Sequence, residues 1–380
     1  MTCDMERKED SFQKFCEALA LKPEQITSEL KAFYEEAEQN GELDCDTCVS
    51  AGLINQLQEK YELFPILLGE VLHGAEVIRQ DASYLKYTNI LRLCVKNKQM
   101  DKYIPFIQAE KDNVAACFAP LFAVLAYVEE AEAEMCRRGI PKEVRLSVHK
   151  AYEKMVLKRK NLFGFSALTS TYYFWSRHYI KPDIYPIGEL EFEITSMHVY
   201  TMVLENVKDG SLWPIREWKE CGSYFEGKPI QRGGSLGEEQ QFLSEEYRGL
   251  LQPGDDILSV HIPRNAHIDG AHYRKDYQSA LEFFAEYYPE KHIKAITCHS
   301  WLMDPELSEC VKASSNIMDF QHYYHVCPFN SSGKEVFSFV FYKPVQDYKE
   351  LPENTSLERA LKKRYLDDNP IYAYLGVHML

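Results

Sequence analysis

The chain of 380 residues is long enough for two domains, and its 45% hydrophobic and 27% charged residues are ordinary for a globular protein. Its formal net charge of -15 at pH 7 argues against nucleic acid or an anionic membrane as a partner, because both need a basic face. The same charge is compatible with a cationic or amine-bearing substrate, although many acidic proteins bind nothing cationic.

Hydropathy and cysteine usage narrow the class further. No run approaches the roughly 18 uninterrupted apolar residues of a membrane span. The first residues, MTCDMERKEDSF, lack the apolar core of a signal peptide. The 11 cysteines follow no regular spacing, and the single CxxC, Cys45 to Cys48, has no second ligand pair at zinc spacing. We therefore expect a cytoplasmic protein with reduced thiols, no membrane partner and no metal.

The first 180 residues have the pattern of a helical domain. A helix is predicted to start at Pro23 and to end at Asn40-Gly41. Apolar residues recur at three- and four-residue spacing in five further segments: 50–60, 64–81, 83–97, 114–137 and 141–160.

The pattern changes at Pro182. Leu190–Ile194 alternates apolar and acidic residues, as a half-buried strand does. Further strands are predicted over 199–204, 257–262, 293–298 and 336–342. Helices are predicted over 238–251, 277–288, 306–312 and 356–365. The sequence predicts an α+β protein, with an all-helical domain over 1–180 and a mixed β-sheet flanked by helices over 181–380.

Ionisable residues gather where two of these strands end. The strand 257–262, the helix 277–288 and the strand 293–298 follow one another in the chain. Ligands of open α/β sheets bind outside the carboxyl ends of parallel strands. Those ends carry His261 and the sequence Cys298-His299-Ser300-Trp301, so we expect the functional site there.

The chemistry of these residues leaves several roles open. His261 shares a strand face with Ser259, and an imidazole suits general-base work, but a buried histidine satisfied by hydrogen bonds fits equally well. Cys298 and Ser300 share a face of the next strand, and either could be a nucleophile beside His261. No glycine-flanked elbow surrounds Ser300 and no acid is placed to orient the histidine, so polar lining of a pocket is the favoured interpretation.

The loop between the first strand and its helix has features of a phosphate site. It contains the cations Arg264, Arg274 and Lys275 and one glycine, Gly270, before a predicted helix. A loop that enters a helix N-terminus favours phosphate. Without a GxGxxG or a Walker lysine motif, an ordinary polar loop is the alternative.

Five segments of the C-terminal half are distinctive. They are GELEFE (188–193), PGDDILSVHIP (253–263), CHSWLMDPEL (298–307), SNIMDFQ (315–321) and LPENTSLERAL (351–361). Together they resemble a family of bacterial proteins that combine a helical N-acyltransferase N-terminal domain with a GNAT-like C-terminal domain. The resemblance implies that acyl-CoA or acetyl-CoA lies between two diverging strands. The loop after the first strand would then cradle the pyrophosphate.

The resemblance also implies roles for individual residues. His261 would be the general base, and Tyr323 or Tyr324 would protonate the departing thiolate. Glu193 and Trp301 would contact the acceptor. The residues implied for CoA are Val260, Ile262, Arg264, Asn265, Gly270, Arg274 and Lys275. The loop departs from the family pattern Q/R-x-x-G-x-G/A, because Gly270 is its only glycine.

The function that follows is an N-acyltransferase that moves an acyl group from acyl-CoA to a small-molecule or peptide amine. The atypical loop favours a rival hypothesis, a non-catalytic ligand-binding or interaction module with the aromatic segment 172–179 as its docking surface. A third hypothesis is a thiol enzyme that uses Cys298. The sequence names neither the acceptor, the acyl chain length nor the oligomeric state.

Overall fold

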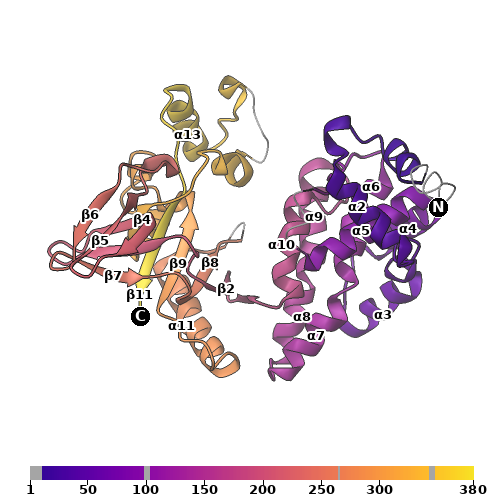
Figure 1. Ribbon diagram of the computed structural model, residues 1–380, viewed down its shortest axis with the longest axis horizontal. Helices are drawn as coiled ribbons and strands as arrows, with labels where there is room; N and C mark the ends of the chain where they lie inside the picture. The colour runs from indigo at the N-terminus through magenta and orange to yellow at the C-terminus, as the bar shows by residue number, and fades with distance from the viewer. Residues whose placement is uncertain (1–10, 98–102, 264–265, 342–346) are drawn as a thin grey trace. The chain divides into compact units, whose positions relative to one another are not determined.

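The computed structural model describes residues 11–97, 103–263, 266–341 and 347–380 (Figure 1). The chain divides into two compact units, Met1–Pro182 and Asp183–Leu380. The first unit is helical, and the second contains two β-sheets and further helices. This arrangement confirms the predicted α+β class.

The helices of the first unit follow the apolar periodicity of the sequence. Thr27, Ser50, Asp81 and Asn113 cap four of them, each side chain accepting a hydrogen bond from a free amide of the first turn. The predicted helices over 114–137 and 141–160 are each divided in two. The helices are α2 Ser28–Gln39, α3 Ala51–Tyr61, α4 Leu68–Gln80, α5 Ala82–Lys96, α6 Val114–Leu125, α7 Val128–Arg137, α8 Lys142–His149, α9 Ala151–Phe163 and α10 Ser170–Ile180.

Helix α6 is the core of the helical unit. All of its residues from Ala115 to Leu125 are buried, and α4, α5 and α10 contact it. Among the described residues, the stretch Val114–Arg137 has the length and hydropathy of a membrane span, but 78% of its apolar window is buried inside the protein. A buried core helix accounts for this composition without a membrane.

The second unit is built on a six-stranded mixed sheet of order β1-β2-β8-β9-β11-β10. The pair β8–β9 is parallel, and the other neighbouring pairs are antiparallel. Helix α11, Gly270–Tyr287, connects β8 to β9 and packs on one face, where Tyr277 contacts Phe192 of β2 with 5.7 Å between ring centroids. The strands are β1 Ile184–Ile187, β2 Leu190–Ser196, β8 Asp256–His261, β9 Ala295–Ser300, β10 His325–Pro328 and β11 Tyr374–Met379.

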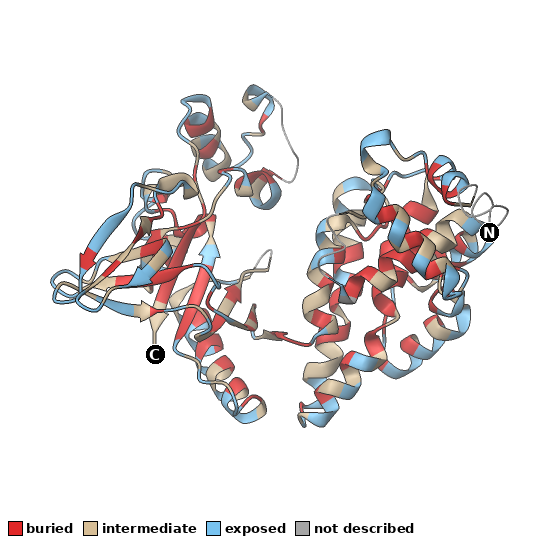
Figure 2. Ribbon diagram, in the orientation of Figure 1, coloured by how far each residue is buried: buried red, intermediate tan, exposed pale blue. Residues whose placement is uncertain are grey.

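A five-stranded antiparallel sheet, of order β6-β5-β4-β3-β7, packs on the opposite face. Val203 and Leu251 from this sheet form one buried cluster with Ile257, Ala295 and Val377 from the other. Figure 2 shows the resulting run of buried residues along the central strands. The strands are β3 Met202–Asn206, β4 Leu212–Glu220, β5 Tyr224–Pro229, β6 Gln240–Leu243 and β7 Tyr247–Leu251.

Two predictions of secondary structure are wrong. The predicted helix over 238–251 forms strands β6 and β7, because pairing with β5 and β3 outweighs the helix propensity of its Glu and Gln residues. The predicted strand over 336–342 is a helical turn at Phe337–Phe341, and Tyr342 lies outside the described residues. Phe337 and Phe341, four residues apart, are both buried on one side of this turn.

The remaining helices complete the second unit. The predicted helix near 356–365 is confirmed as α13, Ser356–Leu366, which starts with a capping box between Thr355 and Glu358. Helix α12, Asn316–His322, and short 3-10 turns at Trp301–Met303 and Pro305–Glu309 lie between β9 and β10. Strands β1, β4, β5, β10 and β11 were not predicted from the sequence.

Candidate active site

Strands β8 and β9 separate at the ends that carry the predicted site. Their parallel ladder joins 257–259 to 295–297 and stops there. Beyond that point, β8 continues to pair with β2 and β9 continues to pair with β11. The two arms therefore open into a V, and all residues of both strands belong to the described part of the chain. The backbone groups that face into the V have no partner strand across it, so an extended ligand can hydrogen-bond to them.

His261 lies at the end of the β8 arm and contacts a carboxylate. Phe192 faces α11, so its neighbours Glu191 and Glu193 point to the other face of the sheet, as does His261, which pairs with Glu191. The Nε2 atom of His261 lies 3.0 Å from Oε2 of Glu193, with the side chains 28% and 15% exposed. In the tautomer whose Nε2–H donates to this carboxylate, Nδ1 is the acceptor nitrogen of the ring.

Glu193 therefore supplies the orienting acid that sequence reasoning did not find beside His261. Glu193 was expected to contact the acceptor amine instead. The two residues are 68 positions apart in the chain and meet only because β2 pairs with β8. The alternation in LEFEI gives the face of Glu193, but the neighbouring strand has no signal in the linear sequence.

A second histidine stands on the β9 arm. The pairing of Ser259 with Thr297 places His299 on the same sheet face as His261. The ring of His299 donates Nε2–H to the carbonyl oxygen of Asn330 at 2.8 Å. His299 is an exposed residue, but partial desolvation of its ring lowers the pKa below its ordinary value of 6.5, so this imidazole is neutral at pH 7.

Cys298 faces the other side of the sheet and is 1% exposed. Burial raises the pKa of its thiol to about 12, which keeps it protonated at neutral pH. These properties argue against Cys298 as a thiolate nucleophile and favour a role in packing beneath the V.

The predicted tyrosines follow α12. The phenol of Tyr324 is buried and hydrogen-bonds the phenol of Tyr277 from α11. Burial raises the pKa of both hydroxyls, so both stay protonated. Tyr323 stacks on His378 of β11 with 4.1 Å between ring centroids.

Ser300 and Trp301 have structural contacts at the end of β9. The hydroxyl of Ser300 accepts a hydrogen bond from the amide of Leu302 at 3.2 Å and caps the turn Trp301–Met303. Trp301 is 9% exposed. Val260 is buried on the α11 face of β8, whereas Ile262, the residue after His261, is partly exposed.

The predicted phosphate cradle carries an acid at its centre. Arg264 and Asn265 lie outside the described residues. Helix α11 begins at Gly270, and the Asp269 carboxylate accepts hydrogen bonds from the amides of Ala271 and His272 at 3.2 and 3.4 Å. The amides that a phosphate would use are therefore occupied by a negative charge.

Cations do surround this helix start. Arg274 and Lys275 are exposed on the first turns of α11, and Arg274 lies 3.5 Å from Asp319. His272 contacts the Asp269 carboxylate through Nδ1 at 2.7 Å. The loop thus combines basic side chains with a capping carboxylate.

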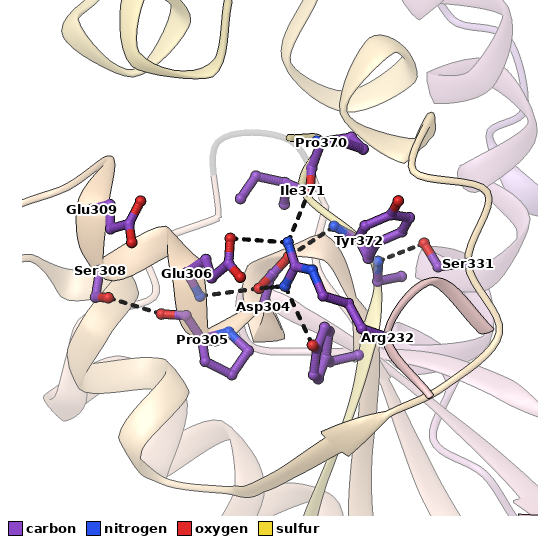
Figure 3. A network of polar contacts seen from close by, with 12 residues as sticks. Arg232, Asp304, Pro305, Glu306, Ser308, Glu309, Ser331, Pro370, Ile371 and Tyr372 are labelled. Atoms are coloured by element: carbon purple, nitrogen blue, oxygen red, sulfur yellow. Dashed lines mark hydrogen bonds and ion pairs between the residues drawn. The ribbon is translucent and has the colours of Figure 1, made fainter. Parts of the chain in front are cut away.

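A buried ionic network fixes the chain just past the β9 arm (Figure 3). The side chain of Asp304 is fully buried and accepts hydrogen bonds from Arg232 at 3.2 Å and from the amides of Glu306 and Tyr372 at 3.0 and 2.8 Å. Arg232 also reaches Glu306 at 3.0 Å and the carbonyl of Pro370 at 3.1 Å. Because only the turn Trp301–Met303 separates β9 from Asp304, this network holds the β9 arm in place.

Comparison with solved structures shows that the fold is shared along nearly the whole chain. A crystal structure of an acyltransferase in complex with decanoyl-CoA and teicoplanin has 18% sequence identity and a TM-score of 0.67, covering 97% of this chain and 99% of that chain. An acyltransferase in complex with CoA and 10C-teicoplanin has 17% identity and a TM-score of 0.68 over the same shares. No curated protein matches the sequence.

The family model described as "GNAT-like C-terminal domain" matches residues 184–378, just over half of the chain. The match spans both arms of the V, the loop before α11 and the two tyrosines. The resemblance drawn from the sequence is thereby confirmed, and the chain belongs to the family of proteins with a GNAT-like C-terminal domain.

Proposed function

We propose that the protein is an acyl-CoA-dependent N-acyltransferase whose acceptor is an amine on a small molecule or peptide. The observation that supports this most is the V between β8 and β9, with the His261–Glu193 pair at its edge. In this proposal the pantetheine arm pairs with the backbone of β8 that faces the V. The thioester then lies between the arms, within reach of His261.

The reaction begins with proton transfer. His261, oriented by Glu193, accepts a proton from the acceptor ammonium, and the free amine attacks the thioester carbon. The N–C bond forms as the carbonyl π pair moves to oxygen, where backbone amides in the V stabilise the negative charge. The C–S bond then breaks, and the CoA thiolate takes a proton from Tyr324 or Tyr323. The nitrogen gives up its second proton, so that of its two protons one restores the tyrosine and the other reaches solvent. Burial raises the pKa of Tyr324 above its ordinary value, which keeps this hydroxyl protonated at neutral pH.

The choice of substrates to test follows from charge and from the similar structures. Glu191 and Glu193 on the face of His261 favour an acceptor that enters as a cation. Decanoyl-CoA and octanoyl-CoA occur in complexes of the similar acyltransferases, so they and acetyl-CoA are the first donors to test.

The Asp269 cap favours a second candidate function, a non-catalytic ligand-binding module. A carboxylate at the helix start opposes a pyrophosphate, and such a module would retain the fold without turnover. Binding and turnover measured on the same preparation separate the two functions.

The test combines calorimetry with a thiol-release assay over a panel of amines. We expect binding of at least one acyl-CoA by the wild type. The variant His261→Ala should keep that affinity and lose turnover by about 100-fold or more, because general-base catalysis contributes on that order. His292→Ala, at the exposed turn before β9, is the matched control and should behave as wild type. Failure of every acyl-CoA to bind at millimolar concentration would overturn the proposal, and binding without turnover would support the second candidate.

A further inference from the structure

The V has a titratable group on each arm. His261 is the last residue of β8, and His299 is the fifth residue of β9, on the same face of the sheet. The pairing of Ser259 with Thr297 is what puts both residues on this face, and the charge of His261 contributes to lowering the pKa of His299. The mouth of the proposed thioester site is thus flanked by two imidazoles from different halves of the sheet.

The two rings have different hydrogen-bond partners. Nε2 of His261 lies 3.0 Å from the Glu193 carboxylate, which orients the ring. Nε2–H of His299 is held by a neutral carbonyl, that of Asn330, and its ring packs against Phe329 with 5.2 Å between centroids. This bond fixes the tautomer of His299 and leaves Nδ1 as a proton acceptor.

Several neighbouring groups influence the pKa of His299. Burial lowers the pKa of His299 most, the Asn330 hydrogen bond and the Glu335 charge raise it, and the His261 charge lowers it further.

The proposed reaction needs two proton acceptors. The acceptor nitrogen enters as an ammonium and leaves as an amide, so it loses two protons. The CoA thiolate gains one proton in the same reaction, so the net release to solvent is one proton. A single imidazole would have to release the first proton before it could take the second.

We propose that His299 is the second proton acceptor of the acyl-transfer reaction, acting from the β9 arm opposite His261. This inference rests on the proposed function. His261 takes the first proton from the ammonium. After the N–C bond has formed, Nδ1 of His299 takes the second proton from the positively charged nitrogen of the tetrahedral intermediate. The C–S bond then breaks, the thiolate is protonated, and the two imidazolium protons return to the tyrosine and to solvent.

The experiment uses the full chain with an alkylamine acceptor taken from the turnover panel. In His299→Gln the side-chain amide can still donate to the Asn330 carbonyl but accepts no proton. We expect kcat to fall by about 10-fold or more, with the acyl-CoA affinity and the acceptor KM unchanged. Protonation of His299 below pH 6.5 should lower the kcat of the wild type, and this decline should be absent from the variant. His292→Gln, at the other end of the segment that forms β9, is the matched control.

A weakly basic amine that is already neutral at the assay pH separates the two roles. Such an acceptor has no ammonium proton to lose, so His261→Ala should turn it over at nearly the wild-type rate. His299→Gln should remain defective, because the tetrahedral intermediate still has to lose its proton. If His299→Gln folds poorly by circular dichroism, His299→Asn is measured instead. Wild-type kcat and pH profile in the His299 variants would overturn the inference while leaving the proposed function intact. Absence of acyl-CoA binding or of turnover in the wild type would instead overturn the proposed function.

Discussion

Asp269 is the residue whose charge matters most for the proposed CoA site. Its carboxylate caps α11 through two amides and contacts His272, so it stabilises the helix while it repels an anion at the same place. Nearby Arg274 and Lys275 have the opposite effect on an anion. Single side chains therefore decide whether the start of α11 attracts or repels an anion.

We predict that Asp269→Ser strengthens acyl-CoA binding. Serine caps a helix about as well as aspartate but has no charge, so the stability of the protein should change by less than about 1 kcal/mol. The KM for acyl-CoA should fall several-fold at low salt, and this gain should shrink at high salt because ions screen the charge. Asp347→Ser, at the cap of a 3-10 turn elsewhere in the same unit, is the control. An unchanged KM would place the pyrophosphate away from the start of α11.

At the scale of elements, the turn of the β1–β2 hairpin approaches α11 closely. Gly188, at the turn, has φ of +66°, and a Cβ atom there would lie 1.8 Å from Oδ1 of Asp276. Asp276 of α11 is 7% exposed and accepts a hydrogen bond from the Glu189 amide at 2.8 Å. The turn therefore needs glycine both for its backbone conformation and for space.

The variant Gly188→Ala should cost about 3 kcal/mol in the free energy of unfolding, from left-handed strain of about 1 kcal/mol and overpacking of about 2 kcal/mol. Gly210→Ala is a matched control in the same unit, because Gly210 has φ of +73° but nothing within 4 Å of an added Cβ. The control should cost about 1 kcal/mol. Urea unfolding of both variants measures the difference, and equal losses would show that Asp276 moves aside freely.

The sequence predicted some of the helices and strands correctly and others wrongly. The strands 257–262 and 293–298 were predicted within a few residues of β8 and β9. The helix between them was predicted over 277–288, but α11 already begins at Gly270, in the segment expected to be a loop. Local apolar periodicity specifies such elements well because both strands are buried. The segments 238–251 and 336–342 were predicted wrongly, because partners distant in the sequence decide their conformation. Strand β11, which pairs directly with β9, was not predicted from the sequence.

At the scale of the molecule, the Asp304 network joins segments that are far apart in the chain. Arg232 precedes Asp304 by 72 positions, and Tyr372 follows it by 68. Glu306 connects Arg232 to Arg364 of α13, and Glu309 contacts Arg364 at 2.5 Å. A fully buried carboxylate with three hydrogen-bond donors is strongly coupled to its partners.

We predict that Asp304→Ala destabilises the protein by about 3–5 kcal/mol, because it leaves the Arg232 guanidinium and two amides without their acceptor. Glu309→Ala is the control, since the Glu309 side chain is 68% exposed and Arg364 retains Glu306. The control should cost less than about 1 kcal/mol. Urea denaturation measures both, and similar losses would contradict a special role for the buried carboxylate.

Some features of the candidate site follow from the local sequence, and others depend on contacts between distant segments. The sequence placed His261 and Cys298 at strand ends, because apolar runs with polar last residues have a local pattern. It did not pair His261 with Glu193 or assign a role to His299, because those relations depend on which strands are neighbours and where their ladder ends.

By itself, the sequence determined the α+β class and the change from helical to strand periodicity at Pro182. It also determined the strand–loop–helix–strand unit that carries the site. Each of these follows from short-range periodicity of hydrophobic residues, which any local conformation must satisfy. Only the tertiary structure decided that β8 and β9 diverge after Ser259, and that His261 acquires a carboxylate while His299 acquires a carbonyl. The physical reason is that strand pairing and burial act between residues far apart in the chain, and they set the charge and tautomer of each side chain only once the fold has formed.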